Sequence, residues 1–141
     1  MLELERQGLN NVRVIQEDAA QVLEWKLPPR CLSGVYLFFP DPWHKTRHHK
    51  RRLVTPAFAA SLSRVMEDGG TLWLATDWQD YAQQMQGVFS SASGFNLAGA
   101  GSDGFVARCP DRPLTRFEQR GQRLGHGVWD LAYCFRASSE F

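Results

Sequence analysis

The sequence predicts an α/β fold in which helices cover a largely parallel sheet. Two predominantly apolar runs, at residues 35–39 and 71–76, are typical of parallel strands that are buried on both faces. Helical patterns of about ten residues alternate with these runs, and such alternation favours a single α/β sheet. The length of 141 residues favours one domain with a core of its own.

The predicted N-terminal elements are short. Residues 1–7 have the composition of the last turns of a helix, and Gly8 suits the position after its end. Because so short a helix is marginally stable alone, we expect its beginning to precede this chain. A frayed terminal helix of a complete protein is the alternative, and composition by itself favours that alternative. Residues 12–16 predict a strand, and Asp18 begins a capping-box pattern that predicts a helix to about residue 26.

The remaining elements continue the alternation of helices and strands. The Thr-Pro pair at 55–56 predicts a helix start, and the glycines at 69–70 are predicted to close that helix. Apolar spacing over residues 81–89 predicts the next helix. Residues 95–97 predict a weak strand. Large apolar side chains alternate with smaller or polar ones over residues 128–135, which predicts the last strand.

Composition excludes several classes of protein. The formal net charge is +1, so the molecule as a whole is not a polycation. Cys31, Cys109 and Cys134 are widely spaced and odd in number, which predicts neither a disulfide framework nor a zinc site. No apolar run is long enough to span a bilayer. Reduced cysteines fit a cytoplasmic protein, and no metal is predicted.

Three aspartates follow predicted elements at the edge where α/β sheets bind ligands, and these are Asp18, Asp41 and Asp77. Asp41 is the most constrained, because a proline on each side restricts its backbone. Its carboxylate can accept hydrogen bonds from base N–H groups, and Trp43 can stack on a base. The alternative for Asp41 is an ordinary turn, and Asp18 and Asp77 are equally well explained as helix caps.

A dense basic run follows Asp41 directly. Residues 44–52 contain five Lys or Arg and three His. Because Lys and Arg neutralise phosphates, the run predicts a polyanion-binding surface next to the carboxylate, most often for nucleic acid. The alternative is a solvated basic face. The histidines have no suitably spaced carboxylate or cysteine, so they predict no metal site.

A second polar cluster precedes the last strand. Residues 115–130 are rich in Arg and punctuated by Gly, and a loop this long needs a reason to be ordered. Thr115 and Glu118 offer hydrogen-bond acceptors, while Arg120 and Arg123 offer guanidinium forks. Substrate binding and an Arg–Glu network that holds the loop are compatible readings.

These segments together closely resemble bacterial tRNA (guanine-N7-)-methyltransferases. The matching segments are 39–45, 47–52, 75–78, 115–121 and 123–130. The resemblance implies a Rossmann-like, S-adenosylmethionine-dependent methyltransferase fold. It also implies methyl transfer to N7 of the guanine at position 46, in the variable loop of tRNA.

The resemblance also implies roles for individual residues. Asp41 would be the catalytic residue and lie near the cofactor, which Asp18 would also contact. The substrate contacts would be Lys45, Asp77, Thr115, Arg116, Phe117 and Glu118. The residues that hold the tRNA would be Arg47, His48, Lys50, Arg51 and Arg52. Because guanine N7 carries a free lone pair, Asp41 is better interpreted as an orienting acceptor than as a general base.

One departure from the family is large. No G-x-G segment between a strand and a helix precedes Asp41, so by the resemblance the fold is incomplete and lacks its first two strands. Residues 1–141 would then be the C-terminal part of a single methyltransferase domain. We expect this chain to bind S-adenosylmethionine weakly or not at all, to be inactive alone, and to be able to dimerise through exposed sheet edges. Pairing of 12–16 with 35–39 would be one way to close the gap.

Two other functions fit the same residues. A non-catalytic RNA-binding module would keep the basic run without a cofactor site. An amino-methyltransferase acting on another substrate is a third reading, because Asp-Pro-Trp is similar to the Asn/Asp-Pro-Pro-aromatic motif of those enzymes.

Overall fold

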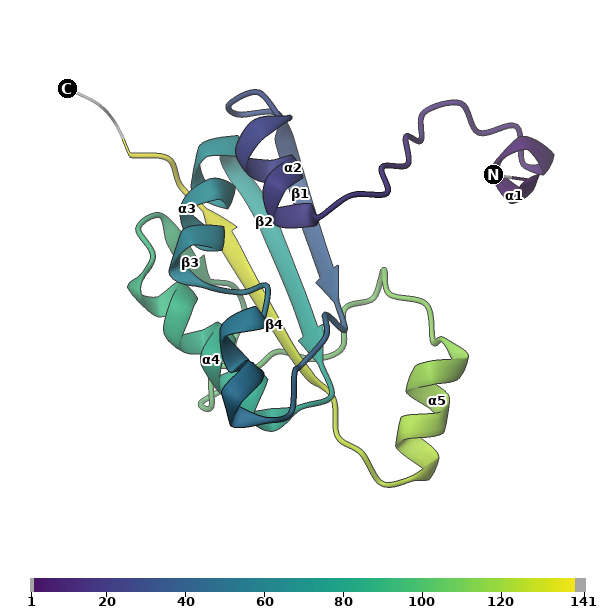
Figure 1. The fold of residues 1–141 in the computed structure, drawn as a ribbon, viewed down its shortest axis with the longest axis vertical. Coiled ribbons are helices and arrows are strands. Elements are labelled where there is room, and N and C mark those ends of the chain that lie inside the picture. Colours follow the sequence, from purple (N-terminus) through teal and green to yellow (C-terminus); the bar gives the residue numbers. More distant parts are fainter. Residues whose placement is uncertain (1, 139–141) are drawn as a thin grey trace.

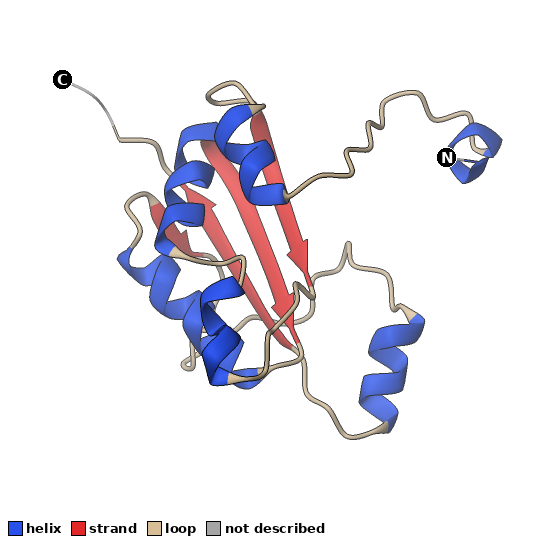
Figure 2. Ribbon diagram, in the orientation of Figure 1, coloured by secondary structure: helices blue, strands red, loops and turns tan. Residues whose placement is uncertain are grey.

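The computed structural model describes residues 2–138 and contains a four-stranded sheet in the order β1-β2-β4-β3 (Figures 1 and 2). The strands are β1 (Leu32–Phe38), β2 (Met66–Thr76), β3 (Phe95–Leu97) and β4 (Trp129–Phe135). β1 and β2 are parallel, as predicted, whereas β4 runs antiparallel to both of its neighbours. The last strand of the sequence is therefore an inner strand of the sheet.

Three helices lie on one face of this sheet (Figure 2). They are α2 (Ala19–Trp25), α3 (Pro56–Val65) and α4 (Gln79–Ser91). Their apolar sides pack on the strands, and the fully buried side chains of the core include Leu62, Leu72, Leu74, Tyr81, Met85, Phe89 and Leu131. The apolar spacing predicted over residues 81–89 therefore marks a helical face that points into the core.

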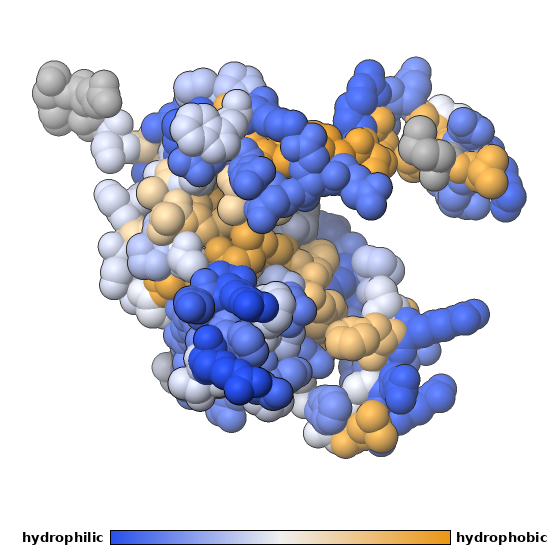
Figure 3. Space-filling model, in the orientation of Figure 1, coloured by the Kyte–Doolittle hydropathy of each residue, from blue (hydrophilic) through white to orange (hydrophobic). Residues whose placement is uncertain are grey.

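Residues 12–16 form no strand, so that prediction is wrong. They lie in an extended segment that joins α1 (Leu2–Arg6) to α2 and leads away from the sheet (Figure 1). Val14 is 72% exposed and Ile15 is 53% exposed, and apolar side chains mark this part of the surface in Figure 3. A short strand is stable only when its backbone is paired and its side chains are buried. This segment has neither, and the outer edge of β1 pairs with no described residue.

α3 ends earlier than predicted. The glycines at 69–70 do not close it, because the helix ends at Val65 and β2 follows at once. Residues 67–70 instead interrupt the regular pairing of β2 with β1. Gly70 fits there because a Cβ atom would lie 2.9 Å from the carbonyl oxygen of Glu67. The glycines therefore allow the irregular stretch of β2 rather than the end of a helix.

Asp18 caps α2, as its spacing predicts. Its carboxylate accepts hydrogen bonds from the backbone N–H of Ala20 at 2.8 Å and of Gln21 at 3.4 Å. The other end of α2 is held by Arg64, which donates to the carbonyl oxygens of Leu23, at 2.6 Å, and Leu27, at 3.0 Å. Side chains thus provide hydrogen-bond partners for free backbone groups at both ends of this exposed helix.

Replacing Asp18 with Ala should lower the free energy of unfolding by about 1 kcal/mol, because the first N–H groups of α2 lose their acceptor. Asp18→Asn should keep most of that stability, since its amide oxygen can cap as well. Chemical denaturation of the three proteins measures the difference. Equal losses in both variants would contradict the capping role.

Two further findings concern the described residues as a whole. Across residues 2–138, no helix is long and apolar enough to cross a membrane. Over the same range, no group of three or more His, Cys, Asp or Glu is placed to hold a metal ion.

Candidate functional site

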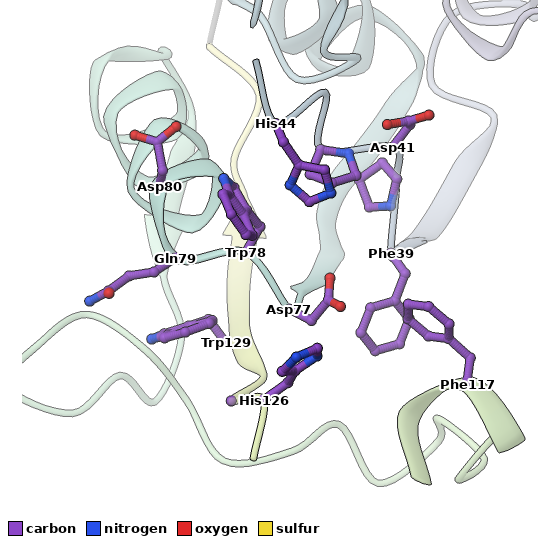
Figure 4. Close-up of a pocket in the computed structure, with 13 residues that line it drawn as sticks. Phe39, Asp41, His44, Asp77, Trp78, Gln79, Asp80, Phe117, His126 and Trp129 are labelled. Carbon is purple, nitrogen blue, oxygen red and sulfur yellow. The ribbon is translucent and has the colours of Figure 1, made fainter. Parts of the chain in front are cut away.

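β1 and β2 end side by side, and the segments that follow them line a cavity of about 920 Å³ (Figure 4). Asp41 follows β1 and Asp77 follows β2, so the structure brings these two predicted site residues to one edge of the sheet. Phe117, from helix α5 (Arg116–Arg123), reaches the same cavity. Asp18 does not line it. The cavity is therefore built by parallel strand ends on one side and by the α5 segment on the other.

The backbone around Asp41 is strained at both ends of its loop. Phe39 and Trp43 have φ values of 53° and 44°, in the left-handed region that large side chains rarely adopt. The Phe39 N–H donates to the carbonyl oxygen of Ala75 at 2.8 Å, which ties the start of the loop to β2. Strain of this kind persists only where the surroundings impose it, and it concentrates at functional sites.

The two carboxylates face different ways. One oxygen of Asp41 accepts the Trp43 N–H at 3.0 Å, closing an Asx turn. Figure 4 shows the Asp41 carboxylate at the rim, directed away from the centre, whereas that of Asp77 points into the cavity. Asp41 thus keeps one oxygen for a ligand at the rim, and Asp77 offers an acceptor inside.

Aromatic side chains form much of the cavity wall. The rings of Trp78 and His44 pack edge to face, with their centres 4.2 Å apart. Those of Phe39 and Phe117 pack in the same way, with their centres 5.4 Å apart. Trp78 is 38% exposed and Phe117 is 58% exposed, so both present ring surface to a ligand. Such surfaces stack on planar bases without regard to sequence.

The residues that line the cavity and had no predicted role include Trp78, His126 and Trp129. Each lies within a segment that carries the family resemblance, and each is next to the end of a strand. Trp43, by contrast, does not line the cavity. Its ring lies under the Arg51 guanidinium, at 5.0 Å, and next to the His48 ring, at 5.8 Å. The aromatic surface that lines this cavity therefore includes Trp78 and Phe117 but not Trp43.

The basic run divides into exposed and buried members. It forms the 3-10 helix η1 (Thr46–Arg51), in which Arg47, Lys50 and Arg51 are exposed and His48 is half-buried. Lys45, just before η1, is exposed as well. Strongly hydrophilic side chains gather over this part of the molecule in Figure 3. These cations form a surface next to the mouth of the cavity.

Arg52 is the buried member, with a side chain that is 1% exposed. It donates to the carbonyl oxygen of Pro42 at 2.6 Å and to Gln84 at 2.8 Å, and it pairs with Asp80 at 2.8 Å. Its guanidinium also lies 4.8 Å above the centre of the Tyr81 ring. Arg52 therefore ties the Asp41 loop to α4, and it is not part of the exposed cationic surface on which it is predicted to hold tRNA.

The predicted residues of α5 are similarly divided. Arg116 and Phe117 are exposed, whereas the Thr115 hydroxyl caps the helix by accepting the Glu118 N–H at 3.2 Å. Glu118 is buried and pairs with Arg112 at 2.6 Å, so its carboxylate contacts protein in this structure. A network of arginine and carboxylate, which the sequence left open as an alternative, is therefore present, but its arginines are Arg108 and Arg112 rather than the expected Arg120 and Arg123. It is compatible with a substrate role only for the exposed members.

A second carboxylate completes this network. Asp130, in β4, pairs with Arg112 at 2.8 Å. Burial raises the pKa of Asp130 above its ordinary value, and the Cys109 N–H and the Arg112 charge oppose that shift. The network thus holds ionisable groups in an environment that disfavours unpaired charge.

The arrangement of strands and helices has a counterpart among solved structures. It is similar to the crystal structure of a SAM-dependent methyltransferase from Archaeoglobus fulgidus. The TM-score is 0.52 at 8% identity, over 94% of this chain and 79% of that one. The predicted Rossmann-like methyltransferase fold, in incomplete form, is confirmed.

Sequence comparison then gives the family. Residues 1–131 match the family described as "Putative methyltransferase", and the chain belongs to that family. The chain is 51% identical over 133 residues to the tRNA (guanine-N(7)-)-methyltransferase of Photobacterium profundum, covering 94% of this chain and 54% of that protein. It is 54% identical over 127 residues to the protein of the same name from Hydrogenovibrio crunogenus, covering 89% of this chain and 52% of that protein. The chain spans about half the length of these curated relatives.

Proposed function

We propose that the protein containing this chain transfers a methyl group from S-adenosylmethionine to N7 of a guanine in tRNA, at position 46 of the variable loop. The observation that carries the proposal is the position of the Asp41–Asp77 cavity beside an exposed cationic surface. The names of relatives that are 51% and 54% identical support the same reaction. Such a protein would work in the cytoplasm, where tRNA is modified.

The geometry suits a guanine that has been turned out of its stack. Trp78 and Phe117 offer ring faces on which the base can stack, and Asp77 offers an acceptor for the N–H groups of its Watson–Crick edge. N7 already carries the reacting lone pair, so these residues need only orient it. The Asp41 carboxylate lies at the rim and is directed away from the centre of the cavity (Figure 4). Once its side chain turns toward the bound base, its free oxygen can stabilise the positive charge that develops as N7 gains the methyl group.

The chain alone does not build a complete cofactor site. One oxygen of the Asp18 carboxylate accepts both helix-capping bonds, and Asp18 lies outside the cavity. The sequence before Asp41 holds no glycine-rich turn that would approach a ligand closely. S-adenosylmethionine would supply the methyl group, and most of the residues that hold it would come from outside this chain.

Calorimetry should accordingly detect no micromolar binding of S-adenosylmethionine to the 141-residue chain. The protein expressed from its complete reading frame should bind the cofactor in the same experiment. Micromolar binding by the chain alone would contradict this account of an incomplete site.

Locating the modified atom tests the proposed reaction. Unmodified bulk tRNA is incubated with the full-length protein and cofactor, then reduced and treated with aniline, which cleaves the strand at N7-methylguanosine. Cleavage at one guanine of the variable loop is expected. Methylation on an exocyclic amino group would favour the amino-methyltransferase, and tRNA binding without any transfer would favour the RNA-binding module.

A further inference from the structure

Arg112 is a buried cation at the meeting point of three parts of the chain. Its side chain is 2% exposed. One end of the guanidinium lies 2.6 Å from Glu118 of α5, and another nitrogen donates to both oxygens of Asp130 in β4, at 2.8 and 3.0 Å. A single arginine fork thus joins α5 to the centre of the sheet.

The flat face of the same guanidinium packs on the end of β1. It lies 5.6 Å from the centre of the Phe38 ring and 5.3 Å from that of Phe39. Phe39 is the strained residue that begins the Asp41 loop, and its ring contacts Phe117 from the other direction. Arg112 therefore supports the conformation of Phe39 while it holds the helix that carries Phe117.

α5 depends on this contact for its place. The helix stands apart from the sheet in Figure 1, within a long excursion of the chain between β3 and β4. Glu118 is its one buried residue. Since Phe117 precedes Glu118 directly, a shift of the Glu118 anchor moves the aromatic wall of the cavity with it.

We propose that Arg112 is a positioning residue, which fixes the α5 wall and the Asp41 loop relative to each other through Glu118, Asp130 and Phe39. It contacts no substrate and acts through these neighbours. Only its effect on catalysis rests on the proposed function. Its effect on the placement of α5 does not.

The variants must separate positioning from folding. Removing Arg112 alone leaves Glu118 with only the partly exposed Arg108, and Asp130 with only the Cys109 N–H, so two buried carboxylates lose their buried cation. That loss can prevent folding. Arg112→Lys keeps the charge but cannot span both carboxylates, because an ammonium is a point charge without a fork. A triple variant, Arg112→Met with Glu118→Gln and Asp130→Asn, removes the charges together. Arg108→Gln is the matched control, since Arg108 also pairs with Glu118, at 3.3 Å, but is 38% exposed.

Hydrogen exchange on the full-length protein gives the decisive measurement. In Arg112→Lys and in the triple variant, amides of α5 should exchange at least about tenfold faster, while those of β2 keep their wild-type rates. Arg108→Gln should change neither. Wild-type exchange in α5, or equal acceleration in β2, would overturn the proposal.

Methyl transfer to tRNA supplies the second readout. We expect both Arg112 variants to lower kcat by about tenfold or more, with KM for tRNA within about twofold of wild type. A rise in KM with unchanged kcat would overturn the positioning role in catalysis. If the wild-type protein methylates no tRNA, the proposed function fails, and the exchange experiment still decides how α5 is held.

Discussion

Asp41→Asn should lower the kcat of methyl transfer by about 10²–10³-fold while leaving the fold intact, because it removes a preorganised charge. Asn can keep the Asx turn, since its amide oxygen accepts the Trp43 N–H that Asp41 now accepts at 3.0 Å. What is lost is the negative charge that would face the developing cation on guanine. Steady-state kinetics on unmodified tRNA measures the loss, and tRNA affinity should change far less.

The chain contains a matched control for this variant. Asp103 closes the same kind of turn, by accepting the Phe105 N–H at 3.1 Å, and does not line the cavity. Asp103→Asn should therefore leave kcat unchanged. Equal losses of turnover and tRNA affinity in Asp41→Asn would assign Asp41 to binding rather than to the chemical step.

Arg51→Gln and Arg52→Gln should affect different properties, although the two residues are adjacent: Arg52→Gln mainly stability, and Arg51→Gln mainly tRNA binding. Arg52→Gln should lower the free energy of unfolding by about 2–4 kcal/mol, because the Pro42 carbonyl, Gln84 and Asp80 lose a buried partner. Arg51→Gln should cost less than about 1 kcal/mol, since only an exposed guanidinium stacked on Trp43 is lost.

Affinity for tRNA should depend on Arg51 rather than on Arg52, the reverse of what is expected for stability. Each phosphate contact that is lost reduces the slope of log affinity against log salt by about one. Arg51→Gln should flatten the slope by that amount, and Arg52→Gln, measured well below its unfolding midpoint, should leave it unchanged. A flattened slope for Arg52→Gln would show that Arg52 leaves its buried position to bind RNA.

The elements that the sequence predicts well are those whose own residues show a clear apolar pattern. Residues 35–38 of the first apolar run lie in β1, residues 71–76 lie in β2, and residues 129–135 form β4. These side chains have the same neighbours in almost any packing of the sheet, so their pattern carries the information. The weak strand at 95–97 is β3, in which only Phe95 is buried. The prediction that the first run is buried on both faces is wrong for the described residues, because β1 lies at the edge of the sheet and contains no buried residue.

The predictions that fail concern segments whose structure depends on contacts with distant parts of the chain. Residues 12–16 have the composition of a strand, yet composition does not supply a neighbouring strand. The glycines at 69–70 resemble a helix end, and only the register of β2 against β1 shows their use. Helix α5 was predicted as a polar loop, because its side chains are almost all exposed and give no apolar period.

The site shows the same limit at the level of single residues. The position of Asp41 and Asp77 at one edge follows from the parallel strands. That Arg52 turns inward while Arg51 turns outward depends on α4, about 30 residues further along the chain. The exposure of each cation in the run therefore had to come from the structure.

The position of β4 also governs how the protein can be made. β4 pairs with both β2 and β3, yet it is the last of the four described strands to be synthesised. Until residue 135 has left the ribosome, β2 has one open edge, and the Phe89 ring lacks the Tyr133 ring that it contacts at 5.2 Å. The nascent chain therefore exposes apolar surface late in translation, a state that favours aggregation or the binding of a chaperone. A premature stop codon near residue 128 would remove the middle of the sheet rather than trim its margin.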